Sequence, residues 1–308
     1  MTKPIKPIAS IVSTELKSWD TEATVRSRPY KYNVDKELSE FEGAQDWYPR
    51  SLLPFLSHSE VNTLAPNLIQ LILAKHLIYF MEYTTQLEHR IVNGAIEALL
   101  YADLGVSIPA SMKAAAMQLY TDEGYHALIS YDVASQVRSI YGLADTPIAP
   151  RRIIDLETLI TSEKVEHQDT IRILIGFVSE TVIAKELAIL SRSALVPAVY
   201  EVLQDHLDDE AKHSKFFSET FLYIWNNSSL AKRNYIEKTA AKILQIFFTA
   251  DSAWLHDTLL SSGISQDTSH EIINDLNSPE SISLRINKNA AVTLRTLHKA
   301  GINLQFGV

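Results

Sequence analysis

Two short stretches of the sequence repeat the order Asp-Glu-x-x-His, and they contain Glu123 with His126 and Glu210 with His213. A glutamate and a histidine three positions apart lie on one face of an α-helix, so each pair can bind one metal ion. Dimetal sites in helical bundles use two such pairs and add one lone glutamate from each of two other helices. The pattern therefore predicts a dimetal site if two further glutamates lie at the same height.

Glu88 fits as the first lone glutamate. In an antiparallel hairpin, residues equally distant from the turn lie side by side, because both helices rise by the same amount per residue. A turn is expected near Val106, which stands almost midway along the chain between Glu88 and the first pair. Glu97 is only half as far from this turn as Glu88, and Glu82 is clearly farther, so both fit less well.

Glu180 fits as the second lone glutamate. A second turn is expected near Leu195, which stands nearly midway between Glu180 and the second pair, whereas Glu186 is much closer to that turn. Glu180 also interrupts the apolar run ILIGFVSETVIA, where an ionised carboxylate is costly without a partner. A metal ion would be such a partner.

His206 shares one helical stripe with the second pair, since positions 206, 210 and 213 recur at steps of four and three. A single Glu-x-x-His pair usually lies on a solvated helix face, but this combination argues for a dimetal site. The chain has no cysteine, so ligands must be carboxylates and imidazoles, which suit iron or manganese better than copper or zinc. The candidate ligands are Glu88, Glu123, His126, Glu180, His206, Glu210 and His213.

Asp122 and Asp209 stand four positions before the histidines of their own pairs. We interpret them as acceptors that orient a ligand imidazole, with solvated helix surface as the alternative.

The helices that would carry these residues follow from the spacing of the prolines. The chain has 9 glycines and 11 prolines, and in the long intervals between prolines apolar residues recur at steps of three and four. This indicates an all-α protein with a four-helix bundle. The long helices are expected over residues 59–104, with a kink near Pro66 as an alternative to a straight helix, and over 109–141, 154–192 and 197–225. Less regular helices are expected over 230–260 and 267–300.

We predict one domain over residues 1–308. Residues 1–55, which contain five prolines, are expected to form an irregular arm. Residues 56–226 would form the dimetal core, and residues 227–308 additional helices and a C-terminal segment.

The composition argues against several other classes of protein. Hydrophobic residues make up 46% and charged residues 21%, which is unlike a disordered chain, and the net charge of −9 does not suit a nucleic-acid partner. The N-terminus lacks the apolar run of a signal peptide. The most apolar stretch, residues 68–81, is interrupted by Lys75 and His76 and is too short to cross a bilayer. We expect a soluble, cytoplasmic protein that does not associate with membranes.

The candidate ligands also carry a resemblance to a known family. Ordinary ferritin-like oxygenases have six protein ligands, and the p-aminobenzoate N-oxygenase family adds a seventh, a histidine four residues before the second Glu-x-x-His. His206 occupies that position. The sequence therefore resembles this family of ferritin-like diiron enzymes over about residues 55–300. The motifs that carry the resemblance are His206-Leu-Asp-Asp-Glu210-Ala-Lys-His213, Glu123-Gly-Tyr-His126 and the lone Glu88 and Glu180.

The resemblance implies that all seven residues bind two iron ions, with manganese as an alternative metal. It also implies a monooxygenase that uses O2 and an external electron donor to convert a small amine to a hydroxylamine, nitroso or nitro product. Members of the family usually act in natural-product biosynthesis. Assembly as a homodimer is left open.

The substrate and the reaction class also stay open at this point. An arylamine, an amino acid and a carrier-bound aminoacyl group all fit the resemblance. Arg285 and Arg295 are candidate anchors for a substrate carboxylate, with surface arginines as the alternative. Competing classes are a diiron hydroxylase or desaturase that acts on carbon, a peroxide-handling enzyme and an iron-storage protein.

Overall fold

The computed structural model describes residues 16, 18–28, 31–34, 45–145, 148–190 and 195–307. Much of the arm predicted for residues 1–55 lies outside these ranges. The described residues form no β-strand, only one isolated bridge between Asp46 and Leu195. The predicted all-α fold with a ferritin-like bundle is confirmed.

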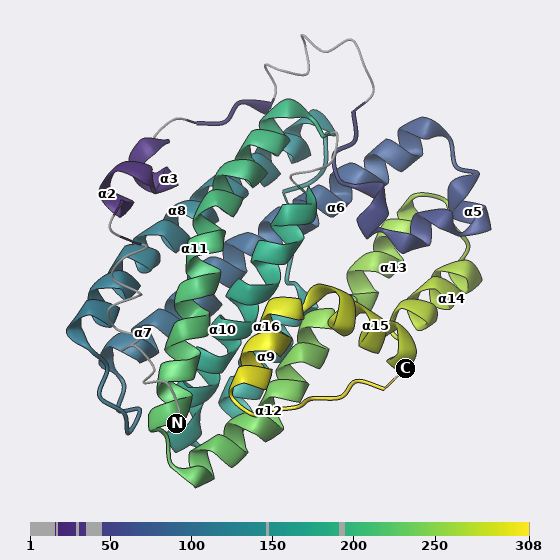
Figure 1. Ribbon diagram of the computed structural model, residues 1–308. Helices are drawn as coiled ribbons and strands as arrows, with labels where there is room; N and C mark the ends of the chain where they lie inside the picture. The colour runs from purple at the N-terminus through teal and green to yellow at the C-terminus, as the bar shows by residue number, and fades with distance from the viewer. Residues whose placement is uncertain are drawn as a thin grey trace.

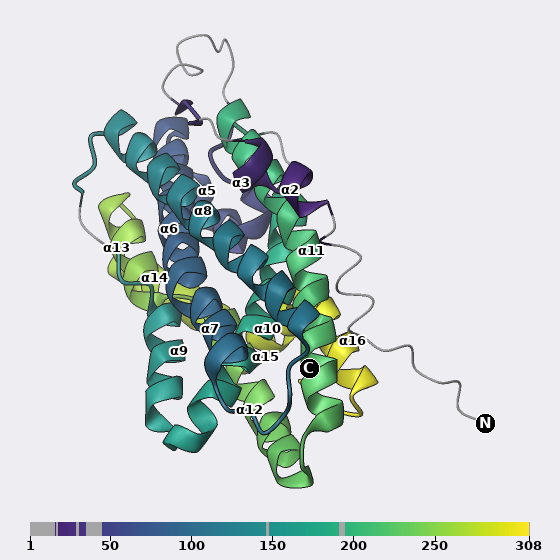
Figure 2. The same ribbon diagram turned by 90° about the vertical axis from the view of Figure 1, so that its left-hand side faces the viewer.

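Four helical rods make the core of the bundle (Figures 1 and 2). In the first rod, α6 (Pro66–Gln86) continues through the π-helical segment η3 (Leu87–Val92) into α7 (Asn93–Tyr101). This rod forms a hairpin with the second, and the third and fourth form another, packed against the first hairpin. The other three rods are α8 (Ala110–Ile140), α10 (Val165–Leu190) and α11 (Pro197–Asn227).

Prolines set the beginnings of these rods. Pro66 and Pro197 are the first residues of α6 and α11, where the missing amide hydrogen costs nothing and the fixed φ angle suits a helix. The helix predicted from residue 59 with a kink near Pro66 is in fact interrupted before Pro66, because α5 (Ser59–Asn62) is a separate turn. Pro66 has no N–H to donate to the carbonyl of Asn62, so a helix cannot run through it without losing that bond.

The helix predicted over residues 154–192 is also interrupted. It consists of α9 (Arg151–Ser162) and α10, separated at Glu163, whose backbone is extended with φ −89° and ψ 159°. Each helix has its own buried face, and α9 packs against both α10 and α12. The periodicity continues through both helices, so it could not reveal the change of direction.

The C-terminal third adds shorter helices beside the bundle. Three of them, α12, α15 and α16, contact α10, and Ser or Asp caps four of the helix N-termini. Figure 1 shows α16 next to α10, with α15 to the right of α16. The helices are α12 (Leu230–Phe248), α13 (Ser252–Ser261), α14 (Gln266–Leu276), α15 (Pro279–Asn289) and α16 (Ala291–Lys299).

Short helical turns precede the bundle. The two 3-10 turns η1 (Arg50–Leu52) and η2 (Pro54–Ser57) lead into α5. Further upstream, α2 (Trp19–Glu22) and α3 (Thr24–Ser27) lie beside α8 and α11 in both views (Figures 1 and 2). The described part of the predicted irregular arm thus includes ordered turns packed on the bundle.

The apolar core forms two clusters along the bundle axis. On α10, Val178 belongs to one cluster and Ile183 to the other, and on α11 Phe216 and Leu203 are divided in the same way. On α10 the two clusters meet at Val182 and Ile183, two and three positions after Glu180. No helix in the described ranges is long and apolar enough to cross a membrane.

Candidate metal centre

The structure brings all seven predicted ligands into one buried layer between the two apolar clusters. None of their side chains is more than 2% exposed. The first hairpin supplies three of them, the second supplies four, and every core rod contributes at least one. Glu88 lies in η3, Glu123 and His126 in α8, Glu180 in α10, and His206, Glu210 and His213 in α11.

The two Glu-x-x-His pairs face each other across α8 and α11. His126 Nδ1 lies 3.2 Å from Glu123 Oε2 and 3.2 Å from Glu210 Oε1. His213 Nδ1 lies 2.7 Å from Glu123 Oε1 and 3.3 Å from Glu210 Oε1. Both histidines therefore present Nδ1 to carboxylates of both helices.

The remaining three residues extend this group on either side. His206 Nε2 lies 3.2 Å from Glu210 Oε1 and 3.9 Å from Glu88 Oε1. Glu180 Oε2 lies 3.8 Å from His213 Nδ1. Ligand atoms within 4.8 Å of one another define three overlapping sets, which are Glu123, His126, Glu210 and His213; Glu88, His206 and Glu210; and Glu88, Glu123 and Glu180.

The glutamates that fitted the spacing less well are engaged elsewhere. Glu82 is paired with Arg138 at 2.6 Å, Glu97 is exposed and accepts a hydrogen bond from Tyr120, and Glu186 accepts one from Tyr48. Counting positions from the turns therefore separates the glutamates of the layer from those outside it.

Unpaired polar atoms show that the layer fits metal ions. Among the residues that the structure describes, both carboxylate oxygens of Glu88, Glu180 and Glu210 are buried without a well-directed hydrogen bond. The same holds for His206 Nε2 and His213 Nδ1. Buried polar atoms are normally paired, and so many unpaired acceptors are costly without a cation. Carboxylates and imidazoles are suitable ligands for iron or manganese.

The buried side chains of the layer shift the pKa values of one another. Burial and the neighbouring Glu123 raise the pKa of Glu88 well above its ordinary value, and burial and Glu210 do the same for the pKa of Glu180. Burial opposes the charged form of His213, but the carboxylate of Glu123 raises the pKa of this imidazole well above its ordinary value. A bound cation would have to displace these protons.

Two aspartates connect the pairs across the helices. His126 Nε2 lies 3.3 Å from Asp209 Oδ2, and His213 Nε2 lies 3.2 Å from Asp122 Oδ2. The predicted role as acceptors thus corresponds to real contacts, but each aspartate contacts the histidine of the other helix. A proton on Nε2 leaves the lone pair of Nδ1 directed into the layer.

Glu88 lies in a helical segment of unusual geometry. Residues 87–92 form π-helical turns inside an otherwise regular helix. Such insertions are rare and occur frequently at functional sites. Gly176, four positions before Glu180, marks a close approach of α10 to α7, because a Cβ there would lie 2.6 Å from Cβ of Ala95.

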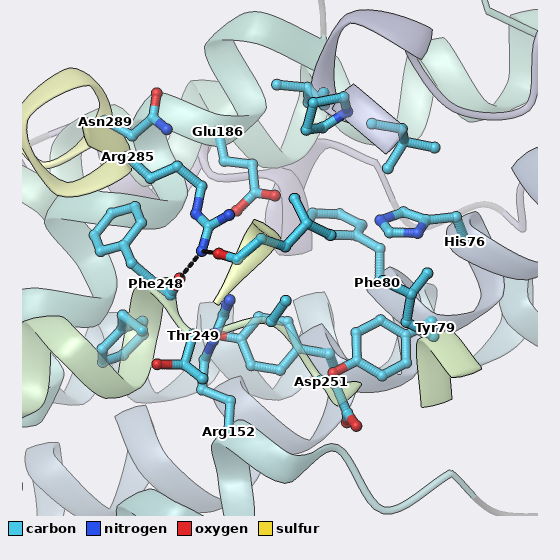
Figure 3. A pocket seen from close by; sticks show the side chains of 18 of the residues that line it. His76, Tyr79, Phe80, Arg152, Glu186, Phe248, Thr249, Asp251, Arg285 and Asn289 are labelled. Carbon is cyan, nitrogen blue, oxygen red and sulfur yellow. Dashed lines mark hydrogen bonds between the residues drawn. The ribbon is translucent and has the colours of Figure 1, made fainter. Parts of the chain in front are cut away.

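A cavity of about 220 Å³ is lined by none of the seven candidate ligands, but by residues close to two of them in the sequence. Tyr83, five positions before Glu88, and Val182, two positions after Glu180, line it. Aromatic side chains form much of its wall, and Arg285 and Arg152 extend into it from different sides (Figure 3).

Two arginines, Arg152 and Arg285, and two carboxylates, Glu186 and Asp251, line the cavity, and Asp251 is the residue directly before α13. Arg285 Nη2 donates to the carbonyls of Phe248 and Leu276 at 2.7 and 2.6 Å. The guanidinium of Arg152 stacks over the ring of Tyr83, 4.7 Å from its centroid. Burial and the like charge of Arg152 lower the pKa of Arg285. Glu186 is the carboxylate near Arg152, where it accepts a hydrogen bond from Tyr48 at 3.3 Å.

Of the two arginines predicted as anchors, only Arg285 lines this cavity, because Arg295 is exposed on α16. Sequence reasoning missed Arg152, which lies in the first turn of α9, just before residue 154 where a longer helix was predicted to begin. It also missed Trp19, whose indole contacts Asp122.

Comparison with known proteins agrees with this geometry. A family model described as P-aminobenzoate N-oxygenase AurF matches residues 15–301, a range that includes the whole layer and the cavity. No curated protein matches the sequence.

Proposed function

Because the chain belongs to the p-aminobenzoate N-oxygenase AurF family, we propose that it is a diiron monooxygenase that oxidises the nitrogen of an aromatic amine. The family makes the chain an oxygenase of the p-aminobenzoate type. The iron, the use of O2 and the amine nitrogen as the oxidised atom belong to the proposal.

The observation that carries the proposal is the buried layer of seven side chains, six of which have unpaired polar atoms. We assign Glu88, Glu123, His126, Glu180, His206, Glu210 and His213 as the ligands of two iron ions. Bound iron would supply the activation of O2, with electrons from an external donor. The protein supplies fixed ligands and a site closed to bulk water.

The cavity supports an aromatic substrate. Its aromatic walls suit a ring, and Arg285 and Arg152 provide positive charge for a carboxylate. With the carboxylate held near Arg285, the opposite end of a p-aminobenzoate-like molecule would extend along Tyr83 and Val182 toward the metal layer. The cavity residues therefore bind and orient the amine while excluding water.

We further propose that the chain forms one domain. The C-terminal helices α12, α15 and α16 pack on α10, which carries Glu180, and α12 and α15 also contribute residues to the cavity wall. The same elements thus support the metal layer and the substrate.

The reaction class can be tested with labelled oxygen. The protein would be loaded with Fe(II) without air, given p-aminobenzoate and a chemical reductant, and exposed to ¹⁸O₂. The proposal predicts ¹⁸O on nitrogen in a hydroxylamine, nitroso or nitro product. Label found only on carbon, across a panel of aryl and alkyl amines, would favour a hydroxylase.

A further inference from the structure

Two residues of the N-terminal turns hold the aspartates behind the metal layer. The indole N–H of Trp19 donates to both carboxylate oxygens of Asp122 at 2.9 Å. The amide N–H of Thr24 donates to Asp209 Oδ2 at 3.0 Å, and the Thr24 hydroxyl donates to the same oxygen. Both aspartates are 1% exposed.

These bonds continue two chains that end at candidate ligands. Trp19 and His213 share the carboxylate of Asp122, and Thr24 and His126 share that of Asp209. Each chain therefore runs from the N-terminal turns through one aspartate to the Nε2 of one histidine. The two chains begin on adjacent short helices, α2 and α3, and reach opposite pairs.

A third contact fixes residues that follow these turns in the sequence to α11. Arg28 Nε forms an ion pair with Asp205 at 3.2 Å, and the Tyr32 hydroxyl donates to Asp205 at 2.6 Å. Asp205 directly precedes His206. The short helices α2 and α3 thus lie beside both α8 and α11, as both views show (Figures 1 and 2).

We propose that Trp19 and Thr24 are positioning residues for the metal ligands, and that docking of residues 19–27 is coupled to metal binding. The inference rests on the proposed metal centre, but not on the reaction that occurs there. The donors hold both aspartates in one orientation, so that each accepts from Nε2 and leaves Nδ1 free for a metal ion.

The coupling follows from linkage. If docking of the segment strengthens metal binding, metal binding must stabilise the docked segment by the same free energy. Without the segment, water would reach Asp122 and Asp209 and would compete with the histidines for their oxygens. No residue of the segment has to touch the metal for this effect.

Two substitutions remove the side-chain donors. The change at Trp19 also makes the ring system smaller, as its matched control does, and the amide donor of residue 24 stays in place. Trp19→Phe removes the indole N–H, and Thr24→Val removes the hydroxyl, whereas Thr24→Ser keeps it. Matched controls are Trp47→Phe, whose indole donates to Tyr141, and Thr239→Val, whose hydroxyl donates to the carbonyl of Tyr235. The controls make the same chemical changes without touching the hydrogen bonds of Asp122 and Asp209.

The first measurement is the affinity for Fe(II) alone, titrated without air. We expect Trp19→Phe and Thr24→Val each to weaken binding by about tenfold, as for loss of one hydrogen bond to a charged group. Thr24→Ser and both controls should bind like the wild type. Melting of the metal-free proteins confirms that each variant is folded.

The second measurement is hydrogen exchange of residues 19–27 with and without Fe(II). In the wild type, Fe(II) should slow exchange of this segment, and in Asp122→Asn and Asp209→Asn the effect should be reduced. The inference would be overturned if Trp19→Phe and Thr24→Val bound Fe(II) as tightly as the controls. It would also be overturned if Fe(II) did not change the hydrogen exchange of residues 19–27 in the wild type. Intact coupling in a protein that does not oxidise amines would overturn only the proposed reaction, whereas a wild type that binds no Fe(II) would overturn both.

Discussion

Asp209 lies 3.3 Å from Nε2 of His126 on the facing helix, and not beside His213, the histidine of its own motif. Asp122 makes the reciprocal contact with His213 at 3.2 Å. Each Asp-Glu-x-x-His motif therefore supplies the acceptor for the histidine of the other. These two reciprocal contacts connect α8 with α11 at the level of the seven candidate ligands.

Asp122 and Asp209, which contact the histidines of the facing helices, should control the affinity for metal ions. We expect Asp209→Asn to weaken Fe(II) binding by about 10- to 100-fold, because its carboxylate no longer fixes the orientation of His126. Asp208→Asn, a change of the exposed neighbouring aspartate, should leave the affinity unchanged. Equal titration curves for the two variants would show that Asp209 does not support a metal ligand.

His206 should affect the reaction more than the loading of metal. It contacts Glu210 and Glu88 at one edge of the layer, so His206→Ala leaves six candidate ligands in place. We expect a folded protein that still binds two metal ions but forms less oxidised amine per bound iron. Glu210→Ala should instead reduce metal content itself.

Metal analysis and product analysis on the same samples separate these effects for His206. An unchanged product yield per iron in His206→Ala would mean that His206 is a packed core residue. In that case only the melting temperature should fall.

Several features of this centre were accessible from the sequence, and others were not. Counting positions from the turns placed Glu88 and Glu180 level with the two pairs, because helical rise is constant and Pro109 and Pro197 mark where the helices begin. The interruption of the helix at Glu163 was not predicted, because neither proline nor glycine occurs there. The π-helical turns around Glu88 were not predicted either, since the spacing of apolar residues does not distinguish them from an α-helix.

The contacts that cross between elements could not be predicted from spacing. A position four residues before a histidine suggests a bond within one helix, but Asp122 and Asp209 bond across helices because the rods pack closely. The pairing of Trp19 with Asp122 joins residues 103 positions apart. Only the packing of the N-terminal turns on α8 and α11 reveals it.

His76 should make stability depend on pH. It packs against Tyr48 and Trp254, and burial lowers its pKa from 6.5 to about 3. In the unfolded chain His76 takes up a proton below about pH 6.5, but in the folded protein it does not. Its contribution to stability is therefore present above that pH and is lost as the pH falls toward 3.

The comparison of wild type with His76→Phe isolates this effect. Between pH 7 and pH 5 the free energy of unfolding of the wild type should fall by up to about 2 kcal/mol relative to that of the variant. Urea unfolding at both pH values measures it, with His89→Gln as the control for an exposed histidine. Parallel pH profiles for wild type and His76→Phe would contradict the burial of a neutral imidazole.

Arg285 should determine the affinity for an anionic aromatic substrate. We expect Arg285→Met to raise the KM for p-aminobenzoate by about tenfold or more, because a charged hydrogen bond to the carboxylate is lost. The effect on kcat and on iron content should be small, since Arg285 belongs to the cavity and not to the metal layer. Arg295→Met, on the exposed face of α16, is the matched control.

Arg285 also holds the carbonyls of Phe248 and Leu276, so Arg285→Met should melt at a lower temperature. Kinetics are therefore measured well below that temperature. A KM shared by wild type, Arg285→Met and Arg295→Met would exclude Arg285 as the anchor.

The iron content of the loaded protein tests the central claim most directly. After anaerobic loading with Fe(II) and removal of free metal, elemental analysis of the wild type should give two iron ions per chain. Glu123→Ala, which removes a carboxylate shared by two of the three ligand sets, should give clearly less. One iron ion or none in the folded wild type would contradict a diiron centre built from these seven side chains.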